Sequence, residues 1–396
     1  MSRAITKRMQ NVKPSAVREI LKVTADPSFI SFAAGNPSSE LFPLDALREY
    51  TARVLANPAS LQYSVTEGYP ELRELVGERY GKGYGLSKPG DDIIIVSGGQ
   101  QGIDLAAHCL LEEGDAVICE NPSFIGALNC FRTYNAELVG IPCDEYGMEI
   151  DKLEAALEAN PRVKLIYTIP TFQNPGGTTL PLERRLRMLE LAVKYDVMIL
   201  EDSPYFELSF DGTITPAIKS FDDSGHVIFA GSFSKIIAPG IRVGFVIAPD
   251  WLTSKMTVAK QGADVHTNGV FMRVAAEFLR GYDVTAHVER CRKLYREKCG
   301  LMLTEMDAKI DKRVRWTKPG GGLFIWCELP ADKPSAGLCE TLKLQKVAVV
   351  PGVAFDTDPD NLANYGFRLN FSVPSKEQIV TGINLLAKGI DDYLAV

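Results

Sequence analysis

Short apolar segments recur between residues 90 and 250 of this 396-residue chain, and segments with helical periodicity separate them. Within each apolar segment the hydrophobic residues are continuous rather than alternating, which is typical of strands covered on both faces. Helical patterns fall at 103–111, 153–159 and 182–195. This alternation predicts an α/β fold, in which helices cover a mostly parallel sheet. The seven expected strands are residues 93–96, 116–119, 138–141, 165–169, 197–200, 227–229 and 243–247.

The pattern changes towards the C-terminus, where helical segments flank only a few candidate strands. The expected elements there are a long helix at 272–306, strands at 322–327 and 347–350, and a last helix at 376–393. We expect them to form a smaller α+β domain, with the first forty-five residues packed on it. The chain length also favours more than one domain. The expected division is a large domain at 46–287 and a small domain made of 1–45 and 288–396.

Composition and charge exclude several classes of function. The chain has 43 Lys and Arg against 50 Asp and Glu, a net charge of −7, and no basic block, so nucleic acid is not expected as a partner. No apolar stretch approaches the length of a membrane span. The eight cysteines are scattered and form no C-x-x-C pair, which favours a reducing, cytoplasmic location. The four histidines lack metal-ligand spacing, so no metal site is predicted.

Polar motifs directly follow several predicted strands, at the sheet edge where parallel strands bind their ligands. Residues 97–101, Ser-Gly-Gly-Gln-Gln, open a helix, and glycines with helix N-terminal amides can hold a phosphate. The alternative is an ordinary tight turn. Asp202 follows the strand at 197–200, either as a site carboxylate or as a helix cap or turn residue. Tyr205, a little further on, belongs either to the core or to the site.

Lys235 follows another predicted strand and ends the sequence Ser-Phe-Ser-Lys. Most lysines are solvated surface residues, but a lysine beside hydroxyls at a strand end can be a covalent amine or a phosphate ligand. Arg242 lies within the apolar run 236–247, so we expect it to be buried beside an anion. Arg368 is likewise a lone cation among apolar and aromatic residues. Its partner would be either a structural carboxylate or the carboxylate of a substrate.

Together these features match what pyridoxal 5′-phosphate chemistry requires of a protein. They supply a phosphate cradle, a lysine for a Schiff base, an aspartate for the ring nitrogen and an arginine for a carboxylate. The aspartate keeps the ring nitrogen protonated, so that the ring acts as an electron sink. The lysine, once released by substrate, moves a proton between Cα and the cofactor carbon.

With these motifs, the sequence resembles the class I (fold type I) pyridoxal-phosphate aminotransferases over nearly its whole length. Within them it is most similar to the α-aminoadipate and kynurenine aminotransferase subgroup. Each motif alone is weak, but their order and spacing match the family. The matching motifs are residues 31–37, 41–43, 61–69, 173–177, 201–205, 232–235, 319–322 and 350–352.

The resemblance implies a large domain with a mostly parallel seven-stranded sheet and an activity that moves amino groups. The donor is an acidic, aromatic or branched α-amino acid, and the acceptor is a 2-oxo acid such as 2-oxoglutarate, in a ping-pong mechanism. A β-lyase or decarboxylase on the same fold is the first alternative. A regulatory aminotransferase-like domain is a remote one, because only about thirty residues precede the first motif and the chain is acidic.

The resemblance also implies roles for residues around the cofactor. Lys235 matches the Schiff-base lysine, and Asp202 matches the carboxylate on the ring nitrogen. Asn174 and Tyr205 match the groups that hydrogen-bond the 3-oxygen and lower the Schiff-base pKa. Phe124 matches the aromatic residue that stacks on the ring. The other matching cofactor positions, most of them in the phosphate cup, are Gly99, Gln100, Ser232, Ser234 and Arg242.

Further roles concern the substrate and a partner subunit. Arg368, with Asn174 and Gly35, matches the clamp on the substrate α-carboxylate. Tyr63 matches a residue that reaches the phosphate of a neighbouring subunit, which implies a homodimer with shared active sites. Arg18 matches an N-terminal arginine that meets acidic substrate side chains in part of the subgroup. The alternative for Arg18 is a surface residue paired with a carboxylate.

One position departs from the subgroup pattern. The phosphate turn usually reads Gly-Ser-Gln-Gln, whereas residues 98–101 here read Gly-Gly-Gln-Gln. One hydroxyl ligand is therefore absent, while the backbone amides remain. We expect weaker retention of the cofactor rather than loss of function.

Overall fold

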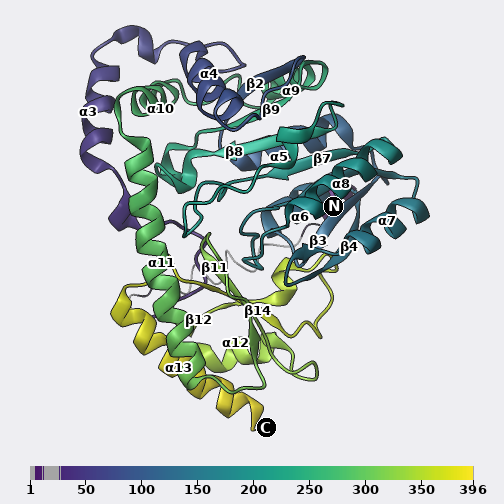
Figure 1. Cartoon of the computed structure of the whole chain (residues 1–396), viewed down its shortest axis with the longest axis vertical. Coiled ribbons are helices and arrows are strands. Elements are labelled where there is room, and N and C mark those ends of the chain that lie inside the picture. The colour runs from purple at the N-terminus through teal and green to yellow at the C-terminus, as the bar shows by residue number, and fades with distance from the viewer. Residues whose placement is uncertain (1–4, 11, 13–25, 27, 396) are drawn as a thin grey trace.

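The computed structural model describes residues 5–10, 12, 26 and 28–395. A large sheet with its helices forms the upper part of the molecule in Figure 1, and a smaller sheet with α12 (Ser335–Leu344) and α13 (Lys376–Leu394) forms the lower part. Helix α11 (Val284–Lys309) runs from one part to the other. Among the described residues, no helix is both long enough and apolar enough to cross a bilayer.

The large sheet contains all seven predicted strands, and a two-residue strand, β5, extends one edge. The strand order is β2-β9-β8-β7-β6-β3-β4-β5. The central strands from β8 to β4 are parallel, whereas β9 is antiparallel to both β8 and β2. A short connection suits an antiparallel pair, and only residues 233–243 separate β8 from β9. The strands are β2 (Asp91–Val96), β3 (Ala116–Asn121), β4 (Glu137–Asp144), β5 (Gly147–Met148), β6 (Val163–Thr168), β7 (Met198–Asp202), β8 (Val227–Ser232) and β9 (Gly244–Pro249).

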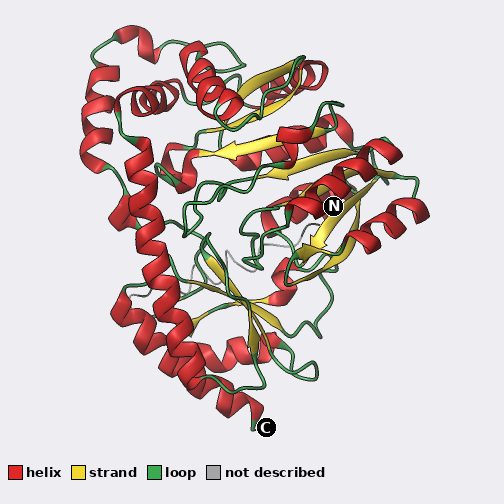
Figure 2. Ribbon diagram, viewed as in Figure 1, coloured by secondary structure: helices red, strands yellow, loops and turns green. Residues whose placement is uncertain are grey.

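Both faces of this sheet are apolar, which explains the continuous hydrophobic runs in the sequence. Adjacent residues on a strand point to opposite faces. In β3, Val117 belongs to a buried cluster with α5 and α6, whereas Ile118 belongs to another with α7 and α8. Figure 2 shows the helices packed around these strands. The helices of this part are α3 (Leu44–Leu55), α4 (Pro70–Val76), α5 (Gly99–Leu110), α6 (Ile125–Thr133), α7 (Ile150–Ala159), α8 (Leu182–Tyr195), α9 (Asp250–Ala263) and α10 (Gly269–Gly281).

The single helix predicted at 272–306 is wrong, because the structure has two helices there, α10 and α11. The break falls at Asp283, whose side chain accepts a hydrogen bond from the Ala286 N–H at 2.9 Å. An aspartate in this position caps the new helix by satisfying one of its free backbone donors. The cap allows the chain to change direction between the two helices.

The small sheet is antiparallel, in the order β10-β11-β14-β13. The strand predicted at 347–350 is also divided in two. Its first half, β12, pairs with β1 near the N-terminus, and its second half, β13, joins β14. The predicted division into domains at 46–287 and the two flanking segments stays a prediction. The strands are β1 (Ile30–Ser31), β10 (Arg315–Trp316), β11 (Phe324–Glu328), β12 (Val347–Ala348), β13 (Val350–Pro351) and β14 (Gly366–Asn370).

Candidate active site

Lys235 lies in a short 3-10 turn, η5 (Phe233–Lys235), directly after strand β8. Ser232 caps this turn, since its Oγ accepts a hydrogen bond from the backbone N–H two residues on. The Lys235 Nζ donates to the carbonyl oxygen of Gly35 at 2.8 Å. Burial lowers the pKa of Lys235 to about 8, and the positive charge of Arg368 acts in the same direction. This amine therefore releases a proton more readily than an ordinary lysine.

Asp202 lies at the carboxyl end of β7, and its side chain is buried. Its Oδ2 accepts a hydrogen bond at 2.8 Å from the hydroxyl of Tyr167, which comes from the adjacent parallel strand β6. Burial raises the pKa of Asp202 to about 6, and this hydrogen bond acts in the opposite direction. No helix begins at Asp202, so the alternative as a helix cap is wrong, whereas a turn at 204–207 does follow it closely.

The glycine turn at 97–101 connects β2 to the first residue of α5. Gly98 has a φ of +83°, and a Cβ there would lie 2.4 Å from the guanidinium of Arg242, so only glycine fits. On the other side, the Ser232 Cβ lies 3.8 Å from where a Gly99 Cβ would be. The N-terminus of α5, a serine and an arginine therefore converge at this turn. This combination of donors can hold a phosphate group.

The prediction that Arg242 is buried is wrong, because its side chain is exposed. Its neighbours Ile241 and Val243 are both buried, but Arg242 itself takes the left-handed conformation, with a φ of 51°. This conformation turns the side chain out of the core, and Nη2 donates to the carbonyl oxygen of Ser97 at 2.8 Å. The guanidinium thus lies against the glycine turn, where an anion can reach it.

Gln100 and Phe124 meet at the start of α6. The Nε2 of Gln100 donates to the carbonyl oxygen of Gly126 at 2.9 Å. A Cβ on Gly126 would lie 2.4 Å from the Phe124 ring and 2.5 Å from Gln100 Oε1, so both side chains pack where only a glycine leaves room. The contact fixes the aromatic ring beside the glycine turn.

An ion pair between a buried lysine and a partly exposed aspartate supports the glycine turn. The Nζ of Lys260, on α9, lies 2.7 Å from Asp264 Oδ1 and donates to Gln101 Oε1 at 2.9 Å. Asp264 in turn accepts hydrogen bonds from Gln101 Nε2 at 2.8 Å and from Ser97 Oγ at 2.9 Å. Both ends of the turn are therefore held by the same charged pair. Sequence reasoning missed this support, because Lys260 lies 159 residues from Gln101 along the chain.

Arg368 lies at the centre of β14, and it is 3% exposed. Its Nη1 donates to Asn174 Oδ1 at 2.8 Å and its Nη2 donates to the carbonyl oxygen of Ala33 at 2.7 Å, while its Nε has no partner. The rings of Phe324 and Phe355 lie 4.2 and 4.8 Å from the guanidinium carbon. No carboxylate of the described residues pairs with it. Burial lowers its pKa to about 10. Its positive charge therefore has no counterion in the part of the chain that the structure describes.

Glu120 is a further buried carboxylate of the site that the sequence analysis missed. It is the last residue but one of β3 and accepts hydrogen bonds from Thr168 Oγ1 at 2.6 Å, Ile169 N–H at 3.2 Å and Gln173 Nε2 at 3.0 Å. Gln173 directly precedes Asn174, so Glu120 holds the loop that contacts Arg368. Burial raises the pKa of Glu120 to about 7. Glu120 directly follows the strand predicted at 116–119, much as Asp202 follows the one at 197–200. This position could have identified it as a candidate site residue.

Most of the predicted site residues fall into two groups, and Tyr63 and Arg18 belong to neither. The first group lies together and comprises Lys235, Asp202, Tyr205, Asn174, Gly35 and Arg368. The second lies around the glycine turn and comprises Gly99, Gln100, Phe124, Ser232, Ser234 and Arg242. Tyr205 is buried, and its ring centre is 5.9 Å from Lys235 Nζ. Tyr63 is 84% exposed and contacts His266 instead of these groups. Arg18 lies outside the described residues.

The donor set fits pyridoxal 5′-phosphate. The cofactor needs an amine, an anion site and a carboxylate for its ring nitrogen. Lys235 offers the amine, and the glycine turn with Arg242 offers the anion site. The second carboxylate oxygen of Asp202, Oδ1, lies 3.9 Å from the Cβ position of Gly99, which joins the two groups of residues. Among the described residues, no cluster of His, Cys, Asp and Glu has the arrangement of a metal site.

Residues 27–384 match the family model for aminotransferases of class I and II. An aromatic-amino-acid aminotransferase of Thermococcus litoralis is 38% identical over 97% of this chain and 93% of its own. The kynurenine aminotransferase structure from Pyrococcus horikoshii, in complex with PMP, is 37% identical with a TM-score of 0.94, covering 98% of this chain and 97% of its own. The α-aminoadipate aminotransferase structure from Thermus thermophilus, complexed with N-(5′-phosphopyridoxyl)-L-leucine, is 35% identical with a TM-score of 0.91, covering 99% of this chain and 98% of its own.

The match extends over most of the chain and agrees with the converging amine, carboxylates and anion site. The chain therefore belongs to the class I and II aminotransferases, and it is a transaminase that uses pyridoxal 5′-phosphate.

Proposed function

We propose that this transaminase moves amino groups between 2-oxo acids, such as 2-oxoglutarate, and α-amino acids with acidic, aromatic or branched side chains. One observation carries the substrate class: Arg368 is a buried cation, and no carboxylate among residues 28–395 pairs with it. An α-carboxylate is the anion that all these substrates share. The relatives' names support the range of side chains, since they cover aromatic amino acids, kynurenine and α-aminoadipate.

The surroundings of Arg368 suit a carboxylate that approaches in the plane of the guanidinium. The rings of Phe324 and Phe355 lie 4.2 and 4.8 Å from the guanidinium carbon, and they offer no polar partner for its N–H groups. Nε is buried without a partner, and each Nη has one further N–H beyond its contact with Asn174 or Ala33. A carboxylate is a planar acceptor that can bind two such donors at once.

The other residues have roles that follow from their pKa values and contacts. Bound pyridoxal 5′-phosphate supplies a ring that withdraws electrons from the Cα–H bond of a linked amino acid. Lys235, with its pKa lowered to about 8, holds and moves the Cα proton at Nζ. Asp202 holds a proton on the ring nitrogen. Burial raises the pKa of Tyr205, so its hydroxyl stays neutral and donates a hydrogen bond.

Replacing Arg368 by alanine is expected to lower kcat/KM about 100-fold or more for every amino donor, because all of them lose the same charged contact. Steady-state kinetics with glutamate, aminoadipate, phenylalanine and leucine, with 2-oxoglutarate as acceptor, measure this. The matched control is Arg315→Ala, since Arg315 lies on the same sheet with a side chain that is 79% exposed. A loss confined to one side-chain class would contradict the proposal.

The same substrate panel tests the prediction for Arg18. Arg18→Ala should lower kcat/KM for glutamate and aminoadipate much more than for phenylalanine and leucine.

Product analysis also separates the proposed reaction from the alternatives on this fold. A transaminase converts each amino acid to its 2-oxo acid, whereas a lyase or decarboxylase releases a different product.

We also propose a homodimer with shared active sites, in the cytoplasm. Large exposed apolar residues gather in sequence around Tyr63, including Leu61 (68% exposed) and Val65 (50% exposed), which supports a buried role in an assembly. All eight cysteines are free, which supports a reducing compartment.

Tyr63→Ala is expected to lower activity about tenfold and to weaken retention of the cofactor, because each Tyr63 would complete the partner's site. Light scattering should give a dimer for the wild-type enzyme. Mixing Tyr63→Ala with Lys235→Ala subunits should restore part of the activity, since one site of each hybrid then has both residues intact. An active monomer would refute shared sites.

A further inference from the structure

The segment 33–38, which we name the strap, crosses the substrate side of the site. Two of its carbonyl oxygens bind the candidate site residues: Ala33 accepts from Arg368 at 2.7 Å, and Gly35 accepts from Lys235 at 2.8 Å. The strap therefore sets where the Arg368 guanidinium lies. The position of the strap depends in turn on what holds its other end.

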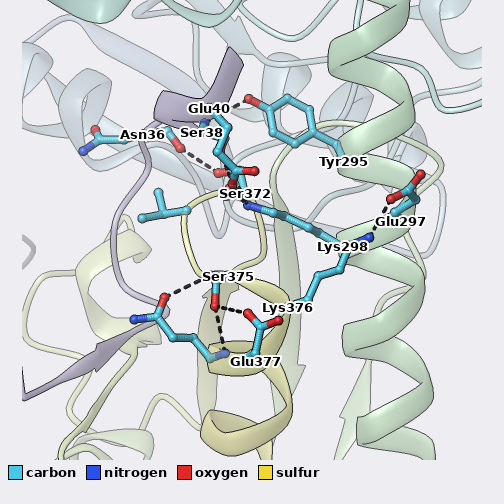
Figure 3. A network of polar contacts seen from close by, with 12 residues as sticks. Asn36, Ser38, Glu40, Tyr295, Glu297, Lys298, Ser372, Ser375, Lys376 and Glu377 are labelled. Carbon is cyan, nitrogen blue, oxygen red and sulfur yellow. Dashed lines mark hydrogen bonds and ion pairs between the residues drawn. The ribbon is translucent and has the colours of Figure 1, made fainter. Parts of the chain in front are cut away.

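Figure 3 shows that other end, where one buried lysine joins three segments of the chain. The Nζ of Lys298, on α11, donates to Glu40 Oε1 at 2.8 Å, to the carbonyl oxygen of Ser372 at 3.1 Å and to Ser38 Oγ at 3.5 Å. These three contacts use all three donors of the ammonium group. Ser372 itself donates through Oγ to the carbonyl oxygen of Asn36 at 2.6 Å.

A tyrosine on the same helix completes this anchor. The Tyr295 hydroxyl lies one helical turn before Lys298 and accepts a hydrogen bond from the Ser38 N–H at 3.1 Å. Lys298 and Tyr295 are thus neighbours on the face of α11 towards the strap. Residues 36–38 are held by α11 and by the segment after β14, which is the strand that carries Arg368.

Burial distinguishes this lysine from an ordinary surface cation. The Lys298 side chain is 2% exposed, whereas that of Glu40 is 61% exposed. An adjacent ion pair, Lys376 with Glu297 at 2.8 Å, is 51% and 42% exposed and does not touch the strap. A buried ammonium with three fixed acceptors holds its partners far more firmly than an exposed pair does.

We propose that Lys298 is a positioning residue that sets substrate affinity by fixing the strap, and through it Ala33 and Arg368. The inference rests on the proposed function of Arg368 as the α-carboxylate clamp. Without the anchor, the strap of the free enzyme is less ordered, and substrate binding must order it again. Such a loss weakens binding of the substrate and of the transition state alike, so it raises KM and leaves kcat unchanged.

The test compares Lys298→Met with Lys376→Met, which removes the exposed neighbouring lysine. Lys298→Met should raise KM about tenfold for glutamate, for phenylalanine and for 2-oxoglutarate, with kcat within about twofold of wild type. Titration of pyridoxal 5′-phosphate into the apoenzyme should give an unchanged dissociation constant. Lys376→Met should leave KM, kcat and the dissociation constant of the cofactor within about twofold of the wild-type values.

Three results would overturn the role of Lys298. They are an unchanged KM in Lys298→Met, a KM that rises equally in Lys376→Met, or a parallel fall in kcat and in cofactor affinity, which would mark a general structural defect. A wild-type enzyme that fails to transaminate these substrates would instead overturn the proposed function itself. The two failures are therefore distinguishable.

A second variant keeps the test valid should Lys298→Met not fold. Tyr295→Phe keeps the ring in place and removes only the acceptor of the Ser38 N–H. We expect a rise in KM of about threefold with unchanged kcat and cofactor affinity. An unchanged KM in Tyr295→Phe would overturn the anchor as a whole.

Discussion

Replacing Lys235 by alanine is expected to abolish transamination, with a fall in kcat of at least about 10³-fold. The reason is that one amine both links the cofactor covalently and moves the Cα proton. The variant should also lose the link that borohydride fixes in the wild-type enzyme. Mass spectrometry of borohydride-treated protein measures that loss directly and does not depend on turnover.

The matched control for this variant is Lys255→Ala, since Lys255 is an exposed lysine on α9. It should keep both the borohydride-fixed cofactor and the activity. If borohydride still fixed the cofactor to the Lys235→Ala protein, another lysine would be the site. The buried Lys260 would then be the first to examine, although its ion pair with Asp264 favours a structural role.

Replacing Asp202 by asparagine should lower kcat about 10²- to 10⁴-fold while the cofactor still binds. The amide has nearly the same shape but carries no negative charge, so it cannot stabilise a proton on the ring nitrogen. Kinetics together with a cofactor titration of the apoenzyme separate the loss of chemistry from a loss of binding.

Tyr167→Phe gives a graded comparison for this prediction. It removes only the hydrogen bond to Asp202 Oδ2 and keeps the carboxylate, so its effect on kcat should be much smaller. A near-normal kcat in Asp202→Asn would show that the carboxylate does not act on the ring. A loss in Tyr167→Phe as large as that in Asp202→Asn would show that the hydrogen bond that holds the carboxylate matters as much as its charge.

The large sheet could be predicted from the sequence because helices cover both of its faces. Strands with apolar residues on both faces give continuous runs such as residues 93–96, and these are easily seen in a sequence. The same reasoning places ligands at the carboxyl ends of parallel strands, and so singled out Asp202 and Lys235. Glu120 lies at an equivalent position on β3 and could have been found in this way.

Other features depend on contacts between distant parts of the chain. The exposure of Arg242 follows from its left-handed backbone, and an apolar run gives no sign of that conformation. That no described carboxylate pairs with Arg368 depends on all the segments that pack against β14. The break before α11 depends on the Asp283 cap, because the helical pattern continues across it. The anchor at Lys298 joins residues 40, 298 and 372, whose separation in sequence hides the cluster.

The two glycines of the phosphate turn differ in how well they would tolerate a side chain. At Gly98 the φ of +83° strains any other residue, whatever room its side chain finds, so this position favours glycine strongly. At Gly99 the nearest atoms to an added Cβ are at 3.8 and 3.9 Å, an ordinary contact distance. The backbone therefore already accommodates the serine that is usual in the subgroup. Gly99→Ser would therefore add the hydroxyl of the subgroup pattern at a position where its Cβ meets no close contact.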